Sequence, residues 1–286
     1  MSNAYPSLEI AGNALVSAAG RKLAPIAAFA HDYSNTPEDV GAIVDVPVIG
    51  TEAGEFNESS NNYGSQTGNF AVAKINVDKH ILAGFTVKPS QIENGLGAFN
   101  DLFTRLGSDA GRAVAKKVES DVFSLLSSTT IELSAATPTT KAGFIGLYEK
   151  TADMDLDSED CVLVLNPATY AKCLEVINGD ISNLEKAIQT GYIDNFLGFK
   201  RIVSTKSLPT GVNGAIIGPS GIGIAARNID LDASAYKSLQ TFQDVDSGVP
   251  ITLLTYTDPA TGNVKISATA IWGQNIIVPE QITLLK

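Results

Sequence analysis

Two histidines and two cysteines are the side chains of this sequence best suited to nucleophilic or acid–base chemistry. A catalytic site of that kind brings a nucleophile, a base and an orienting group together. His31 lies in a segment without sustained periodicity, and His80 falls on the polar side of an alternating strand pattern. The motifs GxSxG, HExxH and CxxC are absent. We therefore predict that the protein is not an enzyme and assign no catalytic residue.

A glycine-rich segment late in the chain has the spacing of a dinucleotide-binding loop. Gly221, Gly223 and Ala226 match the pattern GxGxxA, and Asp244 follows at roughly the right distance. In a Rossmann fold such glycines open a helix whose N-terminus receives the phosphates. Here the segment follows a pair of helical patterns, and no alternating βα series comes after it. We interpret it as a tight strand-to-helix turn with no cofactor, and keep a dinucleotide-binding α/β enzyme as the less favoured alternative.

An acidic run in the middle of the chain begins like a calcium-binding loop. The EF-hand pattern requires glycine at its sixth position and a bidentate glutamate at its twelfth. Ser158 and Val164 occupy these positions, so a solvated loop is favoured over weak binding of a divalent ion, and no metal site is predicted. The run consists of Asp153, Asp155, Asp157, Glu159 and Asp160.

The composition indicates a folded protein that buries apolar surface against other subunits. The 286 residues are 44% hydrophobic and 18% charged, with a mean hydropathy of +0.10, which is unusual for a freely soluble monomer. The net charge of −11 lacks the basic excess of ordinary nucleic-acid-binding proteins. A local basic patch on one predicted helix is interpreted as a solvated face with ion pairs one turn apart. Its members are Arg105, Arg112, Lys116 and Lys117.

The cysteines and the N-terminal residues indicate the cellular compartment in which the protein is expected. Cys161 lies in an apolar run and Cys173 in a predicted helix, so a disulfide framework is not expected and a reducing compartment fits better. The first residues carry no basic region, and no stretch approaches the roughly 18 to 20 apolar residues of a membrane span. We expect a cytoplasmic protein with no membrane partner.

The longest predicted element is an amphipathic helix over residues 98–128. Its apolar residues recur at spacings of three and four, and a helix of this length would span roughly 45 Å. Gly107 and Gly111 each cost about 1 kcal/mol relative to alanine and are expected to let the helix bend. We expect this helix to be a strut across which sheets lie.

Two segments before this helix predict a long hairpin. Residues 40–49 are β-like, and residues 71–87 alternate strictly between apolar and polar side chains. The segment 51–69 between them is rich in glycine, serine and asparagine. An isolated two-stranded ribbon is marginal in water, so it should lie against this molecule or a neighbour. Residues 1–36 show no sustained period and are expected to form an arm rather than a core element.

After the helix, residues 143–245 predict a compact α/β lobe. The apolar run Cys161–Leu165 predicts a buried strand, and Asn166 followed by Pro167 predicts the start of the next helix. A further helix is predicted over residues 181–190.

The end of the chain, residues 246–286, returns to β structure. Alternating segments flank residues 258–263, whose sequence DPATGN is typical of a hairpin turn, and Val278–Leu285 is expected to add a last strand.

The order of these elements resembles the major capsid proteins of tailed bacteriophages, which have the Hong Kong 97 type fold. Three segments carry the resemblance: VDKHILAGFTVKPSQ (77–91), VLNPATYAKCLEV (164–176) and GYIDNFLGFKRIVSTKSLP (191–209). The last is the most specific, with a Leu-Gly step, a short strand, and then a Ser or Thr and a Leu-Pro. The resemblance implies an α+β fold with an N-terminal arm (1–36), an extended hairpin loop (37–80), a peripheral domain with the spine helix (81–142), an axial domain (143–245) and peripheral return strands (246–286).

The resemblance also implies a structural protein that self-assembles into pentamers and hexamers, forming an icosahedral head around the double-stranded DNA of a tailed phage. The acidic net charge predicts that this shell does not bind its DNA strongly. Portal, scaffolding and decoration proteins are the implied partners, and the virion capsid, assembled in the host cytoplasm, is the implied location. An encapsulin-like nanocompartment shell shares the fold and stays an alternative. The charges add a hypothesis in which an acidic loop meets basic residues of a neighbouring subunit, Glu52, Glu55 and Glu58 against Arg105, Arg112 or Lys117.

Overall fold

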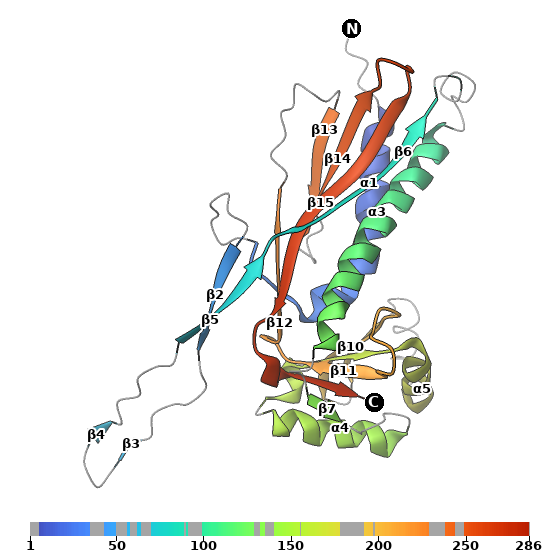
Figure 1. The fold of residues 1–286 in the computed structure, drawn as a ribbon. Coiled ribbons are helices and arrows are strands. Elements are labelled where there is room, and N and C mark those ends of the chain that lie inside the picture. Colours follow the sequence, from blue (N-terminus) through green and yellow to red (C-terminus); the bar gives the residue numbers. More distant parts are fainter. Residues whose placement is uncertain are drawn as a thin grey trace.

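In the computed structural model, an elongated body carries a hairpin that projects from one side (Figure 1). The body has two six-stranded sheets and a pair of long helices. The structure describes residues 6–34, 43–49, 56–57, 62–63, 70–88, 90, 99–128, 132–134, 140–154, 156–177, 192–196, 198–228, 238–243 and 249–285. The helix predicted over residues 181–190 lies outside these residues.

Two long helices lie side by side along the body (Figure 1). Helix α3 spans Phe99–Ser124 and continues as a 3₁₀ turn over Leu125–Ser127, within the range that the periodicity predicted. Helix α1 spans Pro6–Phe29, where an arm was expected. That expectation is wrong, because one stripe of α1 is buried in the main core: Ala11, Leu15, Ala19, Leu23, Ile26 and Phe29.

The first six-stranded sheet lies against these helices and is organised around its longest strand. Strand β15 (Val264–Ile276) pairs with three others, all antiparallel: β14 (Pro250–Thr257), β12 (Ile222–Arg227) and β6 (Lys79–Val87). Strand β13 (Ser238–Gln243) pairs with β14, and β1 (His31–Asp32) pairs with β12; among the described strands, β6 pairs with β15 alone and forms the opposite edge. The hairpin turn predicted between β14 and β15 is confirmed, with Gly262 at a φ of 69°.

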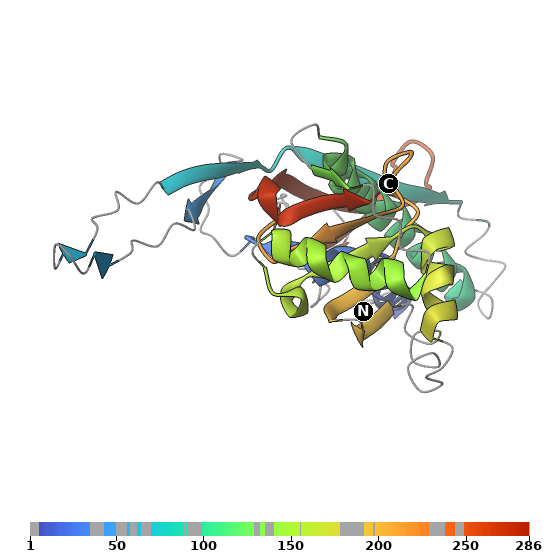
Figure 2. The same ribbon diagram turned by 90° about the horizontal axis from the view of Figure 1, so that it is seen from below.

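The second sheet crosses the end of the body and is covered on both faces (Figure 2). Its central strand β8 (Val162–Leu165) is fully buried. Val162 and Val164 face the main core, whereas Leu163 and Leu165 face helices α4 (Lys141–Asp153) and α5 (Pro167–Ile177). The strand order is β7 (Glu132–Ser134), β16 (Ile282–Leu285), β11 (Gly214–Ile217), β8 (Val162–Leu165), β10 (Phe199–Ser204) and β9 (Tyr192–Phe196).

Helices α4 (Lys141–Asp153) and α5 (Pro167–Ile177) begin at side-chain caps. The Thr140 hydroxyl accepts from Gly143 N at 3.1 Å, and Asn166 Oδ1 accepts from Thr169 N at 2.8 Å. The second cap confirms the helix start predicted from Asn166 and Pro167. Short 3₁₀ turns lie at Ser158–Asp160 and Pro279–Gln281.

The strands divide between the sheets differently from the predicted ranges. Within 143–245, β12 and β13 belong to the sheet of β15. Within 246–286, β16 pairs with β11 of the other sheet. Hydrogen-bonded partners far apart in sequence decide this division, and the local pattern does not contain that information.

Both cysteines are buried in the core beneath α4 and α5. Burial, with smaller contributions from Asp160 and Asp157, raises the pKa of Cys161 to about 11, and burial raises that of Cys173 to about 12. Because the thiolate is the reactive form, we expect neither thiol to react with a disulfide reagent at pH 8 in the native protein and both to react after unfolding in guanidinium. Absorbance of the released aromatic thiol measures this, and rapid labelling of the native protein would contradict the burial.

Candidate assembly surfaces

The projecting hairpin has one packed face and one exposed face. Strands β2 (Ile43–Ile49) and β5 (Phe70–Asn76) pair antiparallel, with Pro47 opposite Val72. Val46 and Ile75 point inward and pack with Ala225 and Ile277 of the body. Further along the hairpin, β3 (Phe56–Asn57) pairs with β4 (Asn62–Tyr63).

The opposite face of the β2–β5 ribbon is uncovered and carries large apolar side chains among polar ones. Ile43 is 56% exposed and Val72 55% exposed. Because side chains alternate along a strand, these two lie on one face together with Pro47, Asp45 and Lys74, all of them exposed. A two-stranded ribbon that leaves large apolar side chains in water is marginal unless another surface covers it. This face is therefore the first candidate for contact with a neighbouring subunit.

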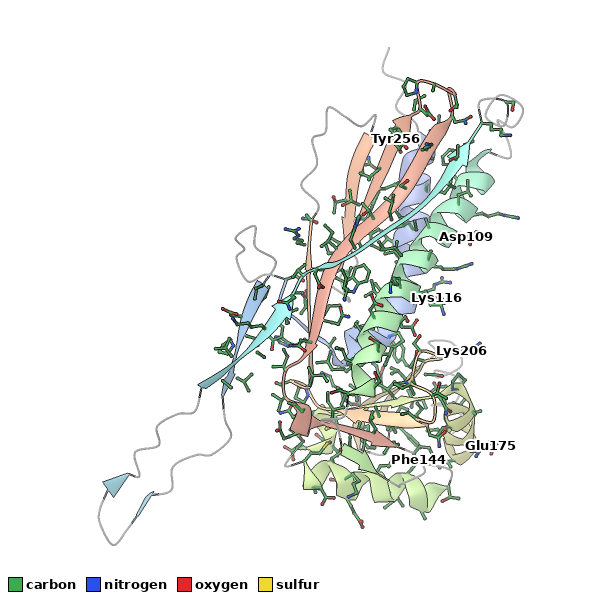
Figure 3. All side chains as sticks on the ribbon, in the orientation of Figure 1. Asp109, Lys116, Phe144, Glu175, Lys206 and Tyr256 are labelled. Atoms are coloured by element: carbon green, nitrogen blue, oxygen red, sulfur yellow. The ribbon has the colours of Figure 1, made fainter. Side chains whose placement is uncertain are left out.

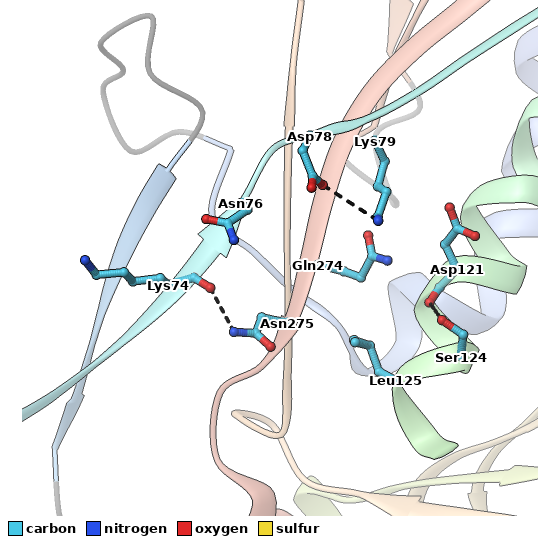
Figure 4. Close-up of a pocket in the computed structure, with 9 residues that line it drawn as sticks. All are labelled: Lys74, Asn76, Asp78, Lys79, Asp121, Ser124, Leu125, Gln274 and Asn275. Atoms are coloured by element: carbon cyan, nitrogen blue, oxygen red, sulfur yellow. Dashed lines mark hydrogen bonds and ion pairs between the residues drawn. The ribbon is translucent and has the colours of Figure 1, made fainter. Parts of the chain in front are cut away.

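A polar pocket of about 310 Å³ lies where the hairpin joins the body (Figure 4). Asn275 Nδ2 of β15 donates to the backbone oxygen of Lys74 at 2.8 Å and so ties β5 to the sheet. A Cβ atom on Gly273 would overlap the backbone oxygen of Asn76 and also crowd Val77. Glycine is thus required where β15 passes beneath the root of the hairpin.

A groove of about 870 Å³ lies between α1, α3 and the loop that follows β10. Its floor includes Glu119, which is 6% exposed and accepts a hydrogen bond from Thr205 Oγ1 at 2.5 Å. Figure 3 shows Lys116 of α3 and Lys206 of the loop on the same side of the molecule. Five lining side chains are cationic: Arg21, Lys22, Arg112, Lys116 and Lys206.

In the sequence, Arg112 and Lys116 belong to the predicted basic patch, which we interpreted as a solvated face. The remaining cations of the groove were missed because they come from α1 and from a loop about 80 residues beyond the end of α3. One local signal existed: Arg21 and Lys22 are the only charged residues between Ile10 and Ala30.

Two further apolar sites lie on the outside of the body. Leu82 of β6 is 61% exposed, and Ile145 and Tyr148 on the outer face of α4 are exposed by more than half. Figure 2 shows α4 lying across the outside of the second sheet. Like the ribbon, these positions carry large apolar side chains that a monomer leaves in water.

The residues of the predicted subunit contact are only partly described. Glu52, Glu55 and Glu58 lie outside the described residues. Arg105, Arg112 and Lys117 are exposed on α3. Arg112 pairs with Asp109 at 3.4 Å and Lys117 with Asp121 at 2.6 Å, whereas Arg105 has no carboxylate within 4 Å in the described part of the chain.

The glycine-rich segment is not a helix start. Gly221 precedes β12 and Gly223 lies within it, so the turn joins two strands and the predicted strand-to-helix turn is wrong. The alternation of Ile222, Ile224 and Ala226 is a strand signal that outweighs the glycine spacing. Asp244 lies outside the described residues. This geometry contradicts the dinucleotide-binding alternative, because no helix N-terminus follows β11.

The other candidate chemical residues make structural contacts. His80 Nε2 lies 2.8 Å from Thr269 Oγ1 on the paired strand β15, and the His31 ring packs on Tyr33 with centroids 4.7 Å apart. Asp153 ends α4 and pairs with Lys150 at 2.6 Å. Among the described residues, no three potential metal ligands gather in one place. In the same part of the chain, no helix is long and apolar enough to cross a lipid bilayer.

No protein-family model and no curated protein sequence matches this chain. Solved structures do match it. The capsid of a native GTA particle aligns with a TM-score of 0.57 and 13% identity over 93% of this chain and 90% of that one. The virus-like particle from Pyrococcus furiosus aligns with a TM-score of 0.56 and 16% identity over 97% and 98%. A chain from Mycobacterium phage Che8 aligns with a TM-score of 0.55 and 15% identity over 86% and 85%.

These alignments span nearly the whole chain, and the matched structures are named as capsids, phages or a virus-like particle. The chain therefore has the α+β fold of the tailed-bacteriophage major capsid proteins, the Hong Kong 97 type fold, as the order of its elements predicted.

Proposed function

We propose that this protein is a major capsid protein whose copies form the closed icosahedral shell of a tailed phage around double-stranded DNA. The observation that carries the proposal is the projecting hairpin, because Ile43 and Val72 on its outer face are more than half exposed and have no covering partner in the described part of the chain. In a shell of pentamers and hexamers, a neighbouring copy would cover this face. The exposed side chains of α4 and β6 would meet further copies.

The role is structural rather than enzymatic, and the protein acts in the virion capsid after assembly in the host cytoplasm. Portal and scaffolding proteins are the expected partners of such a shell, and decoration proteins are an optional addition to it. With a net charge of −11 per subunit, the shell as a whole repels the phosphate backbone, so DNA is enclosed with little adhesion.

For the contact between subunits, we keep the hypothesis of an acidic loop against a basic helix. Glu52, Glu55 and Glu58 of one copy would meet Arg105, Arg112 or Lys117 of the next, and Arg112 and Lys117 would exchange their pairs with Asp109 and Asp121 for this contact. Reversing the three glutamate charges should lower the yield of assembly and change its dependence on salt. Assembly that is unaffected by the reversal would refute the contact.

Negative-stain electron microscopy and light scattering test the shell itself. The protein expressed alone, and then with its neighbouring genes, is expected to give closed shells or rings of five and six. A monodisperse monomer or dimer under every condition would overturn the proposal.

A shell that encloses a protein cargo is the second candidate. What supports it is the alignment to a structure named as a virus-like particle and not as a phage, from Pyrococcus furiosus, which spans 97% of this chain and 98% of that one. Nuclease-protected DNA in purified particles would support the phage head. A co-purifying enzyme in particles without DNA would support the compartment.

A further inference from the structure

The cationic groove concentrates positive charge in an acidic protein. Five of the 20 lysines and arginines line it, and they come from three segments: α1, α3 and the loop after β10. Among the described residues of the lining, Glu119 is the one acidic side chain. The described lining therefore carries five positive charges against at most one negative charge, although the chain has 31 acidic residues.

Most of these cations are available to a ligand. Lys22, Lys116 and Lys206 are exposed, and none has a carboxylate within 4 Å in the part of the chain that the structure describes. Arg112 pairs with Asp109 at 3.4 Å, but both side chains are more than 60% exposed, so this pair is weak and exchangeable. Glu119 is buried and hydrogen-bonded to Thr205.

The rest of the lining indicates what kind of anion fits. The lining that the structure describes includes no aromatic side chain on which a base could stack. Its apolar residues are alanines and prolines, which offer little to the anchor side chains of a peptide. Serine hydroxyls add neutral donors beside the cations: Ser17, Ser108, Ser204 and Ser207. Lysines, arginines and hydroxyls are the groups that contact phosphates without reading base sequence.

We propose that this groove binds the phosphate backbone of double-stranded DNA, independently of base sequence, with one contact site per subunit. The proposal rests on the proposed function in one respect, that the shell holds DNA. The groove proposal adds that the side of the subunit formed by α1 and α3 faces the interior of the shell. It also adds that the genome adheres to the shell only at this groove.

The test is the salt dependence of binding of a fluorescein-labelled 20-base-pair duplex to the full-length protein, followed by fluorescence anisotropy. The groove variant replaces Lys22, Lys116 and Lys206 with glutamine. The control variant makes the same change at three exposed lysines outside the groove, Lys79, Lys172 and Lys200. Both variants therefore lose the same charge, and circular dichroism confirms that each is folded.

Each lost phosphate contact lowers the slope of log K against log salt by about 0.9. The groove variant is therefore expected to lose about 2 to 3 from the slope and about tenfold or more in affinity at low salt. The control should keep a slope close to that of the parent protein. If the groove variant does not fold, the single changes Lys22→Gln and Lys206→Gln replace it, with an expected loss of about 1 each.

Equal slopes for the groove and control variants would overturn the proposal, because binding would then follow overall charge alone. So would tight binding of polyglutamate with no detectable binding of DNA, which would assign the groove to an acidic peptide. Electron microscopy of the same preparations separates the two proposals. Shells that form while the groove variant binds DNA like the parent leave the shell function standing and refute only the groove.

Discussion

Replacing Gly107 and Gly111 together with alanine is expected to destabilise the protein by up to about 4 kcal/mol, because overpacking costs up to about 3 kcal/mol per site and alanine regains about 1 kcal/mol per site over glycine in a helix. A Cβ atom on Gly107 would overlap the backbone oxygen of Ala11, and one on Gly111 that of Leu15. The backbones of α1 and α3 therefore touch at these glycines. From the sequence we expected these glycines to let α3 bend, whereas in the structure they allow α1 to pack closely against α3.

Gly146 of α4 is the matched control, since a Cβ atom there would meet nothing within 4 Å. Alanine at this position should stabilise the protein by up to about 1 kcal/mol, the usual gain for glycine in a helix. Urea unfolding of unassembled protein, followed by circular dichroism, measures all three variants. A double variant as stable as the parent, or more stable, would contradict the close approach of α1 and α3.

Replacing Ile43 and Val72 with aspartate is expected to abolish shell assembly while the subunit stays folded. Both side chains are more than half exposed in the single chain, so the change removes little buried area from the monomer. In an assembled shell the same positions would be covered, and burying two unpaired carboxylates there would oppose association strongly. We expect the yield of sedimenting particles to fall at least about tenfold, the effect of about 1.4 kcal/mol per contact.

Two controls accompany this variant. Exchanging the two residues, Ile43→Val with Val72→Ile, keeps the face apolar and should preserve assembly. The melting temperature of the unassembled aspartate variant should stay close to that of the parent. Normal particle yield from the aspartate variant would show that the open face of the β2–β5 ribbon is not a subunit interface.

The elements with a strong period were predictable from the sequence. Helix α3, the buried strand β8 and the β14–β15 hairpin each have a pattern that local chemistry explains. Helix α1 was missed because its buried stripe alternates alanine with larger residues, as in Ala11, Leu15 and Ala19, and so gives a weak hydrophobic period. Pro25 within the helix weakened the pattern further.

The partners of the strands were not predictable. Strands β12 and β16 each have an apolar pattern that fits either sheet, and only the assembled core decides which sheet each one joins. The same limit applies to the groove, because its cations are separated by long stretches of chain. Arg21 and Lys206 have no relation in the sequence, yet both line one cavity. Packing between elements that lie far apart in the sequence creates such sites, and the periodicity of side chains within one element gives no information about that packing.

The main hydrophobic core continues from the first sheet to the second without interruption. It joins α1 and α3 to the first sheet and continues onto one face of the second sheet through residues such as Val164, Ile217 and Leu284. A well-packed interior resists deformation, so we expect the body of each subunit to move as a rigid unit. In the proposed shell, differences in curvature between fivefold and sixfold positions would then be accommodated at the contacts between subunits and at the root of the hairpin, beside Gly273.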